Sequence, residues 1–199
     1  MKHFPSVTRI LDATRPQHEI DALEAWKARV GEEQAERIRQ EAITRGQRYD
    51  AMIEDHRAGK AIAHPALAKT LQGYSFLAHE KDVYSETYRY KGRLDSIYKS
   101  GTNIIINDYK GATKVKSKEH AASYFMQLAA YWYAVEEMSA KAGDNMVIDY
   151  GLITWILPTS VSQQLVSRQT KELYFEAFIQ RVEQYHQSQE QTADATTGG

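Results

Sequence analysis

Two aspartates in the middle of the chain have the type and spacing of a site that could bind a hard cation. Asp95 and Asp108 lie on two β-rich runs, RLDSIY and NIIINDY, that flank a Ser-Gly-Thr sequence. If Gly101 and Thr102 form a two-residue turn, the hairpin register places Asp95 directly across from Asp108. Opposed Cβ atoms are roughly 4.5–5.5 Å apart, and like charges at that distance destabilise the pair. The two carboxylates therefore need solvent or a bound cation.

A lysine extends this pair toward phosphate chemistry. Asp108 and Lys110 are two residues apart, so their side chains project from the same face of a strand. The apolar residues 104–106 before them indicate that the strand is buried. Carboxylates are ligands for hard divalent cations, and an ammonium group beside such a cation suits a phosphate. An isolated D-x-K triplet also occurs by chance, so the facing acid carries this interpretation.

Composition limits the other possibilities. The chain has 199 residues, 42% of them hydrophobic, and no cysteine. This length fits one domain, and the absence of cysteine excludes disulfides and thiolate zinc sites. The net charge of −1 predicts that any nucleic acid is held by a local basic patch. No run reaches transmembrane length and the first residues lack a signal-peptide core, so we expect no membrane contact and a cytoplasmic location.

Hydrophobic periodicity predicts helices, then strands, then alternating elements. The first helix is short and capped by Ser6 or Thr8, and the chain after residue 186 is polar and expected to be disordered. We expect further helices over residues 18–30, 32–56, 65–77, 117–141 and 168–186. We expect strands over residues 83–90, 93–98, 103–109 and 147–157. This order predicts an α/β sandwich with a mixed central sheet flanked by helices.

One predicted helix carries acids that could join the site. Gly46, Asp50 and Glu54 are four residues apart and share a face of the helix over residues 32–56. Glycine inside a helix costs about 1 kcal/mol relative to alanine, so Gly46 is expected to allow a close approach. A solvated acidic face is the alternative for the two acids. Glu86, on the predicted strand 83–90, is expected to form a salt bridge.

A later helix and loop carry further polar candidates. Gln127 and Tyr131 share a face of a largely apolar helix, and a buried glutamine needs hydrogen-bond partners. Beside the acids, Gln127 would orient a water or a phosphate oxygen; a hydrogen-bonded core glutamine is the alternative. Lys114 and Lys116 follow Lys110 in a dense run of lysines, which suits phosphate contacts or a solvated loop.

Taken together, these motifs resemble a known family. The sequences GRLD (residues 92–95), IIINDYK (residues 104–110) and Q-x-x-x-Y (residues 127–131) are similar to those of the PD-(D/E)XK nuclease superfamily. The Q-x-x-x-Y element points to the RecB-type exonuclease branch. PSVTRIL (residues 5–11) and R-G-x6-I-E (residues 45–54) further resemble the mitochondrial genome maintenance exonucleases and their phage relatives. The similarity covers roughly residues 4–157.

The resemblance implies a fold and roles for individual residues. It implies a restriction-endonuclease-like core in a single nuclease domain over residues 1–186, with a mainly helical part (1–80) and a catalytic core (81–186). The implied catalytic residues are Asp95, Asp108, Lys110 and Gln127. The implied ligands of Mg²⁺ or Mn²⁺ are Asp95, Asp108, the Tyr109 carbonyl, Asp50 and Glu54. The implied DNA contacts are Tyr131, Lys114, Lys116 and Arg93.

Two positions depart from the family pattern. The family usually has histidine where this chain has Asp50, which leaves either another metal preference or a lost ligand. Leu94 replaces the proline of the superfamily name, as this branch tolerates.

The expected activity follows from the resemblance. It is metal-dependent hydrolysis of DNA from single-stranded ends, with Trp26, Tyr49 and Tyr124 as candidates for base stacking. A structure-specific endonuclease on flaps or junctions is one alternative. A decayed nuclease fold that binds DNA or a partner without cutting is another. Replication or recombination proteins are the expected partners, in a bacterial or phage-infected cell.

Overall fold

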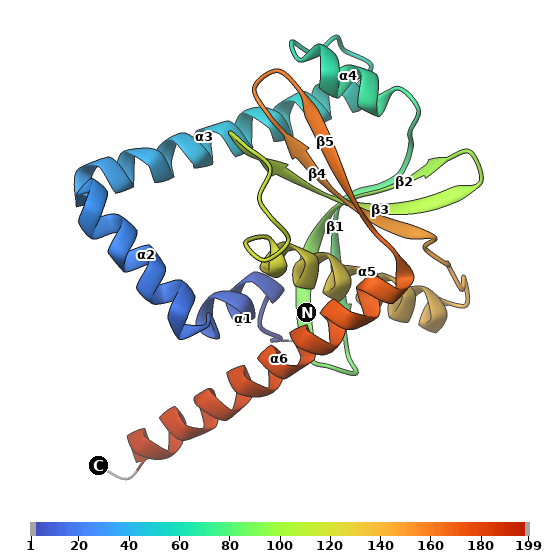
Figure 1. Ribbon diagram of the computed structural model, residues 1–199. Helices are drawn as coiled ribbons and strands as arrows, with labels where there is room; N and C mark the ends of the chain where they lie inside the picture. The colour runs from blue at the N-terminus through green and yellow to red at the C-terminus, as the bar shows by residue number, and fades with distance from the viewer. Residues whose placement is uncertain (1–2, 198–199) are drawn as a thin grey trace.

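The computed structural model describes residues 3–197 (Figure 1). It contains helices and strands in the order that the sequence predicts, with one additional strand near the end. The helices are α1 (Val7–Ala13), α2 (Gln17–Val30), α3 (Glu32–Arg57), α4 (Pro65–Leu71), α5 (Ala122–Ala142) and α6 (Arg168–Thr197). The strands are β1 (Ser75–Ser85), β2 (Tyr90–Ser100), β3 (Asn103–Gly111), β4 (Tyr150–Ile156) and β5 (Val161–Val166).

The five strands form one mixed sheet in the order β1-β2-β3-β4-β5. Only β3 and β4 are parallel, and the other neighbours are antiparallel. A parallel pair needs a long crossover connection, which α5 provides. The mixed sheet flanked by helices is the restriction-endonuclease-like arrangement that the sequence predicts. The prediction missed β5, whose sequence VSQQLV has two consecutive glutamines and no clear alternation.

The first hairpin differs from the prediction. Residues 83–90 do not form one strand, because β1 ends at Ser85 and β2 begins at Tyr90. Ser85 Oγ donates to the Glu137 carboxylate and accepts from the backbone N–H of Tyr88, which closes the turn. The Tyr88 ring packs edge-on against Phe175. This tertiary contact explains an aromatic residue in a turn, although aromatic residues favour strands.

The ends of helices α1, α5 and α6 agree only in part with the prediction. Ser6 caps α1 and accepts a hydrogen bond from the Arg9 backbone N–H at 3.1 Å, as predicted. The α5 helix begins at Ala122, later than predicted. The α6 helix continues to Thr197, so the predicted end near residue 186 and the disordered tail over 187–199 are wrong as far as Thr197. Residues 198–199 lie outside the described residues.

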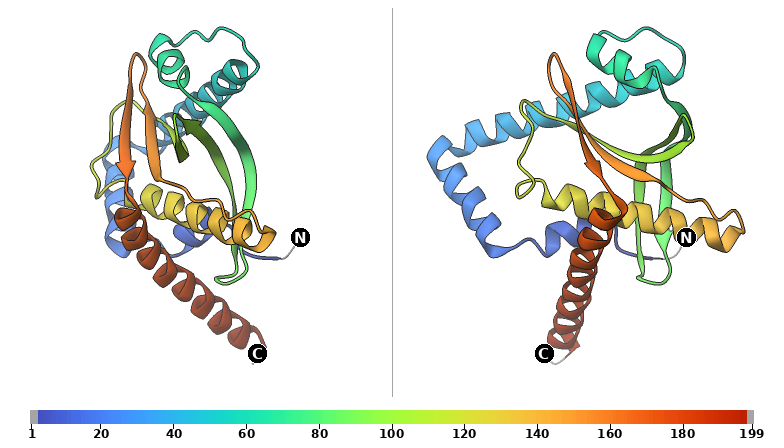
Figure 2. Two further views of the ribbon diagram at one scale, coloured as in Figure 1. Left: turned by 90° about the vertical axis from the view of Figure 1, so that its right-hand side faces the viewer. Right: turned by 45° about the vertical axis from the view of Figure 1, so that its right-hand side comes forward.

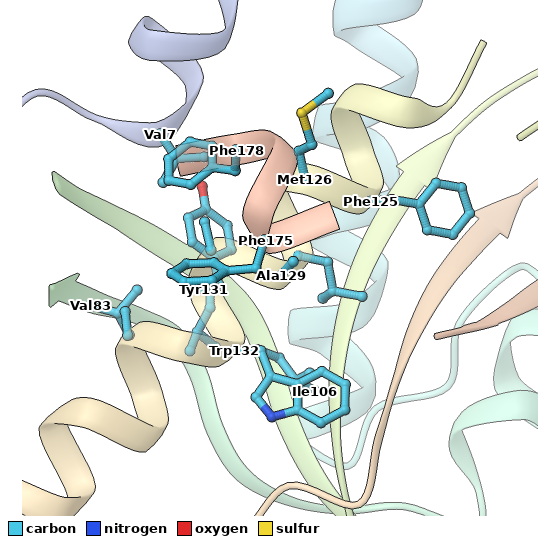
Figure 3. Packing of buried hydrophobic residues seen from close by; sticks show 14 of the residues in the cluster. Val7, Val83, Ile106, Phe125, Met126, Ala129, Tyr131, Trp132, Phe175 and Phe178 are labelled. Atoms are coloured by element: carbon cyan, nitrogen blue, oxygen red, sulfur yellow. The ribbon is translucent and has the colours of Figure 1, made fainter. Parts of the chain in front are cut away.

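Two apolar layers hold the sheet. On one face α5 packs on the sheet through residues that include Phe125 and Trp132, and α6 adds Phe178 (Figure 3). On the other face, Tyr49 and Ile53 of α3 form a second cluster with residues of α4, β3 and β4. The buried residues of this second cluster are Tyr49, Ile53, Leu67, Leu71, Tyr109 and Ile156.

The first half of α3 and all of α2 stand away from the sheet (Figures 1 and 2). The α2 helix has no buried residue. The apolar residues Ile38 and Ala42 of α3 are exposed, because this half of the helix has no sheet beside it. A Cβ at Gly46 would meet nothing within 4 Å, so the expected close approach there is wrong within the chain itself.

In the described part of the chain, no helix combines the length and the apolar character that crossing a membrane requires.

Glu86 forms the expected ion pair, with Lys141 at 3.1 Å. The helical region ends at Leu71 and β1 begins at Ser75, close to the predicted boundary at residue 80. The division into one nuclease domain stays a prediction.

Candidate active site

The β2–β3 hairpin has the register that the turn predicts. Ser100 pairs with Asn103, and the pairing continues to Ser96 opposite Asn107. Asp95 and Asp108 are the next residues in this register. Asp95 Oδ2 accepts a hydrogen bond of 2.7 Å from the Tyr109 backbone N–H, which ties this carboxylate to β3 beside Asp108. The two acids therefore converge at the same place on the sheet.

The two carboxylates are held in an unfavourable environment. Asp108 is 1% exposed, and neither of its oxygens has a hydrogen-bond partner of good geometry among the described residues. Burial and the charge of Asp108 raise the pKa of Asp95 to about 7, and burial raises the pKa of Asp108. Both shifts mean that ionising this pair costs free energy when no cation is bound.

Lys110 offsets part of this cost. Its Nζ lies 2.7 Å from Asp108 Oδ2, and its side chain is 20% exposed. Burial alone would lower the pKa of Lys110, but Asp108 and Asp95 together raise it above its ordinary value. The lysine is therefore a fixed cation beside the two acids. Its ammonium also lies 4.9 Å from the centre of the Tyr124 ring, a cation–π distance.

Helix α5 positions Lys110 through two side chains. Lys110 Nζ donates to Gln127 Oε1 at 3.3 Å, and Gln127 Nε2 donates to the Tyr131 hydroxyl at 3.1 Å. Gln127 is thus hydrogen-bonded, and its partner is the lysine of the site. A Cβ at Gly92 would lie 2.3 Å from Tyr131 Cε1, so β2 passes against this ring only because residue 92 is glycine. The α5 side of the site is tightly packed.

Helix α3 reaches the site from the other direction. A Cβ at Gly111, one residue after Lys110, would lie 2.9 Å from Tyr49 Cδ2, so the helix and the end of β3 are in close contact. Asp50 follows Tyr49 and is exposed. Partial burial and the charge of Glu80 raise the pKa of Asp50, while Lys110 lowers it. Asp50 therefore lies within electrostatic range of the site lysine.

Glu54 is occupied by other partners. Its carboxylate forms an ion pair with Arg57 at 2.9 Å and lies 3.4 Å from His79 Nε2. Within the described residues, no three His, Asp or Glu side chains gather as a metal-binding group. Asp50 and Glu54 are therefore not clustered with Asp95 and Asp108, and their roles as metal ligands stay predictions.

The basic residues that are expected to contact DNA differ in whether other side chains of the protein already bind them. Arg93 pairs with Asp82 at 3.0 Å and with Glu80 at 3.6 Å. Lys116 donates to the Tyr124 hydroxyl at 2.9 Å. Lys114 is exposed and forms no ion pair with the residues that the structure describes. Their contacts with DNA remain predictions.

The candidates for base stacking, Tyr49, Tyr124 and Trp26, differ in how exposed their rings are. Tyr49 is only 6% exposed in the second apolar cluster and cannot stack on a base. Tyr124 is half-buried beside Lys110 and Lys116, and Trp26 is half-buried on α2.

The comparison with protein families agrees with this geometry. A model of the PD-(D/E)XK nuclease superfamily matches residues 1–198. The chain belongs to this superfamily. It is thus placed among nucleases, hydrolases that act on nucleic acid, and the superfamily usually uses divalent metal ions. A search of curated proteins finds no match.

Solved structures resemble this PD-(D/E)XK chain only distantly. An alkaline exonuclease (LHK-Exo) from Laribacter hongkongensis is 12% identical, with a TM-score of 0.39, over 75% of this chain and 86% of that one. The crystal structure of SSO0001 is 19% identical, with a TM-score of 0.35, over 59% of this chain. The match spans 55% of SSO0001, little more than half its length.

The residues of this PD-(D/E)XK site fit a hard divalent cation. Asp108 supplies two buried oxygens, one of them 2.7 Å from Lys110 Nζ, and Asp95 lies beside it. Such a cation prefers oxygen ligands and would relieve the repulsion between the carboxylates. The fit rests on this pair of acids, and the nature of the metal stays a prediction.

His79 and Glu80 border the same PD-(D/E)XK site but were not predicted as part of it. The His79 side chain is 6% exposed, its Nδ1 has no partner among the described residues, and burial lowers its pKa. Glu80 has a φ of 43°, a backbone conformation that costs an ordinary residue free energy. The sequence predicts this strand only from residue 83, after both residues. The observed strand begins at Ser75 and pairs His79 with Ser96, beside Asp95.

Proposed function

We propose that the protein is a metal-dependent DNA exonuclease that removes nucleotides from single-stranded ends. The observation that carries the proposal is the pair Asp95 and Asp108, which meet beside a lysine that Gln127 holds in place. The family match supplies phosphodiester hydrolysis as the reaction class. Mg²⁺ or Mn²⁺ is the proposed cofactor, held by the two acids with the Tyr109 carbonyl as a further oxygen.

The chain's own groups have defined tasks in this reaction. A bound divalent cation lowers the pKa of water and neutralises charge on the phosphate. Lys110 stays protonated next to Asp108 and faces the negative charge that develops on the phosphate. Gln127 and Tyr131 fix the lysine's position, so its charge needs no reorganisation during the reaction. Asp50 and Glu54 are proposed to support a second cation or its water.

The preference for single strands rests on the shape of the helical region. The α2 helix and the first half of α3 stand off the sheet with no buried residue on α2, as an arm beside the site (Figure 2). A cavity of about 500 Å³ along α3 is lined by Arg37, Arg45 and Arg48, which suit a phosphate backbone. Trp26 and Tyr124 are the proposed stacking residues.

The direct test is digestion of end-labelled DNA with and without Mg²⁺ or Mn²⁺. The substrates are linear single strands, duplexes, strands blocked at the 5′ or the 3′ end, and a circular single strand. We expect cleavage only with metal, only of substrates with a free end, and loss of activity in Asp108→Ala. Lys99→Ala, an exposed position on the same hairpin, is the matched control. No metal-dependent loss of nucleotides from any substrate would contradict the proposal.

The same DNA substrates distinguish two alternative functions. Cleavage of the circular strand, or of flaps and junctions at internal bonds, would indicate a structure-specific endonuclease. A non-catalytic DNA-binding role is the other alternative, and the feature that favours it is Asp50 where the family usually has histidine. Calorimetric titration with Mn²⁺ decides this point, because a site without function should show no binding that depends on Asp95 and Asp108.

A further inference from the structure

A cavity lined by basic side chains lies at the junction of the N-terminal segment, β2 and α6. We call it the His186 cavity; its volume is about 480 Å³, and Arg9, Lys91 and His186 line it together with His3. Among the described residues that line it, none is acidic. These basic side chains come from segments far apart in the sequence, so the fold brings them together.

The cavity has two side chains that are permanently charged, Arg9 and Lys91, and no acidic side chain of the described residues pairs with either. Neither the Arg9 guanidinium nor the Lys91 ammonium forms an ion pair with any residue that the structure describes. Arg93, two residues further along the same strand, shows the contrast, because it pairs with Asp82 at 3.0 Å. His186 adds a buried Nε2 without a hydrogen-bond partner in residues 3–197. Uncompensated donors around one cavity favour an anion.

The backbone fixes the positions of these donors. The Lys91 backbone N–H donates to the Pro5 carbonyl at 3.0 Å, and Ser6 forms a β-bridge with Lys91. Ser6 also caps α1 and binds the Arg9 backbone N–H. Tyr185, the neighbour of His186, is buried and anchors this turn of α6. The side chains of Arg9, Lys91 and His186 therefore project from a backbone frame that these contacts hold in place.

A larger cavity shares part of its wall with the His186 cavity. We call it the Tyr131 cavity; its volume is about 820 Å³, and Gln127 and Tyr131 form part of its wall. These are the residues that hold Lys110. Phe4, Ser6 and Lys91 line both cavities. The Tyr131 cavity thus reaches from the residues that position Lys110 to the His186 cavity, and Asp82 and Glu86 line it together with Lys91 and Arg93.

We propose that the His186 cavity binds the terminal phosphate monoester of the DNA strand that is cut at Asp95 and Asp108. This inference rests on the proposed function. The Tyr131 cavity is large enough for a ligand of nucleotide size and lies between the two sites. The bound terminal phosphate is therefore not next to the bond that is cut, and the released products are longer than one nucleotide.

The test measures binding without cleavage. Fluorescence anisotropy in EDTA compares single-stranded oligonucleotides that carry a 5′-phosphate, a 3′-phosphate or only hydroxyl ends. We expect one phosphorylated form to bind wild-type protein about tenfold tighter than the hydroxyl form, in line with charge-assisted contacts. Arg9→Gln should weaken that preference, and Arg9→Gln with Lys91→Gln should remove it; because Lys91 also lines the Tyr131 cavity, only the single Arg9→Gln variant should keep the affinity for the hydroxyl form within about twofold. Lys99→Gln, on the same strand as Lys91, should keep the preference.

The outcomes separate this inference from the proposed function. Equal binding of all three ends by wild type, or a preference that survives in the double variant, overturns the terminal-phosphate site whether or not the protein cuts DNA. Inorganic phosphate is the further probe. If it binds wild type and not the double variant while oligonucleotide ends make no difference, the cavity is a free-phosphate site and the link to DNA is wrong. Mononucleotide products in the digestion assay would contradict the predicted product length.

Discussion

Replacing Asp95 with asparagine is expected to stabilise the metal-free protein while abolishing its activity. The pKa of Asp95 rises from 3.8 to about 7, first because of burial and then because of Asp108. A change of one in pKa corresponds to about 1.4 kcal/mol, so ionising Asp95 costs the folded protein up to ~4 kcal/mol. Asparagine keeps an oxygen that can accept the Tyr109 N–H bond, but it carries no charge.

The sign of the pH dependence follows from the direction of the shift. The folded pKa is higher than the unfolded one, so the folded state binds the proton more tightly. The stability from this proton is complete below pH 3.8 and is lost as the pH rises through about 7. The advantage of Asp95→Asn over wild type should therefore grow by about 3 kcal/mol between pH 5 and pH 8.

Urea unfolding in EDTA at pH 5 and pH 8 measures this difference. Asp144→Asn, the same substitution at an exposed position, is the matched control. Added Mn²⁺ should stabilise wild type at pH 8, since a ligand that binds only the folded state raises stability, and should have little effect on Asp95→Asn. The reasoning is refuted if the variant is less stable than wild type at pH 8, or if the two proteins differ equally at both pH values.

Three further predictions concern side chains around the site. Lys110→Ala should lower the rate of cleavage by about 10²-fold or more, because it removes a cation next to the phosphate; single-turnover kinetics at saturating DNA measures this, and full activity would exclude the lysine. Gly92→Ala should destabilise the protein by about 1–3 kcal/mol, because its Cβ overlaps the Tyr131 ring; urea unfolding beside Gly73→Ala, which meets open space, checks this, and equal losses would contradict the packing. Ser6→Ala should cost about 1 kcal/mol through loss of the α1 cap; an unchanged unfolding midpoint would show that the cap contributes nothing.

The sequence alone was enough to predict that Asp95 and Asp108 lie side by side, because a hairpin register depends only on the turn. A two-residue turn at Gly101 fixed the pairing of Ser100 with Asn103, and the period of two along each strand then set the positions of Asp95 and Asp108. The spacing of Asp108 and Lys110 likewise determined that they share a face. Helices α2 and α3 were also predictable from their periodicity and from Gly31 between them.

The tertiary structure decided which side chains meet the pair. Periodicity placed Gln127 and Tyr131 on one face of α5, but their bond to Lys110 depends on how α5 crosses the sheet. The close approach of α3 occurs at Gly111 and not at Gly46, because a glycine's neighbour comes from another element of the fold. Tyr88 appeared to be a strand residue and lies in a turn, since its packing against Phe175 outweighs local propensity.

The arrangement of the candidate site could thus be predicted from the local sequence, while its surroundings could not. A turn and a strand period act between residues a few positions apart, so Asp95, Asp108 and Lys110 could be placed by counting. The environment that raises the pKa of Asp95, the contact of Glu54 with His79 and the meeting of Arg9, Lys91 and His186 join distant segments. Such contacts exist only after the chain has folded, because packing of the whole sheet and its helices determines which faces come together.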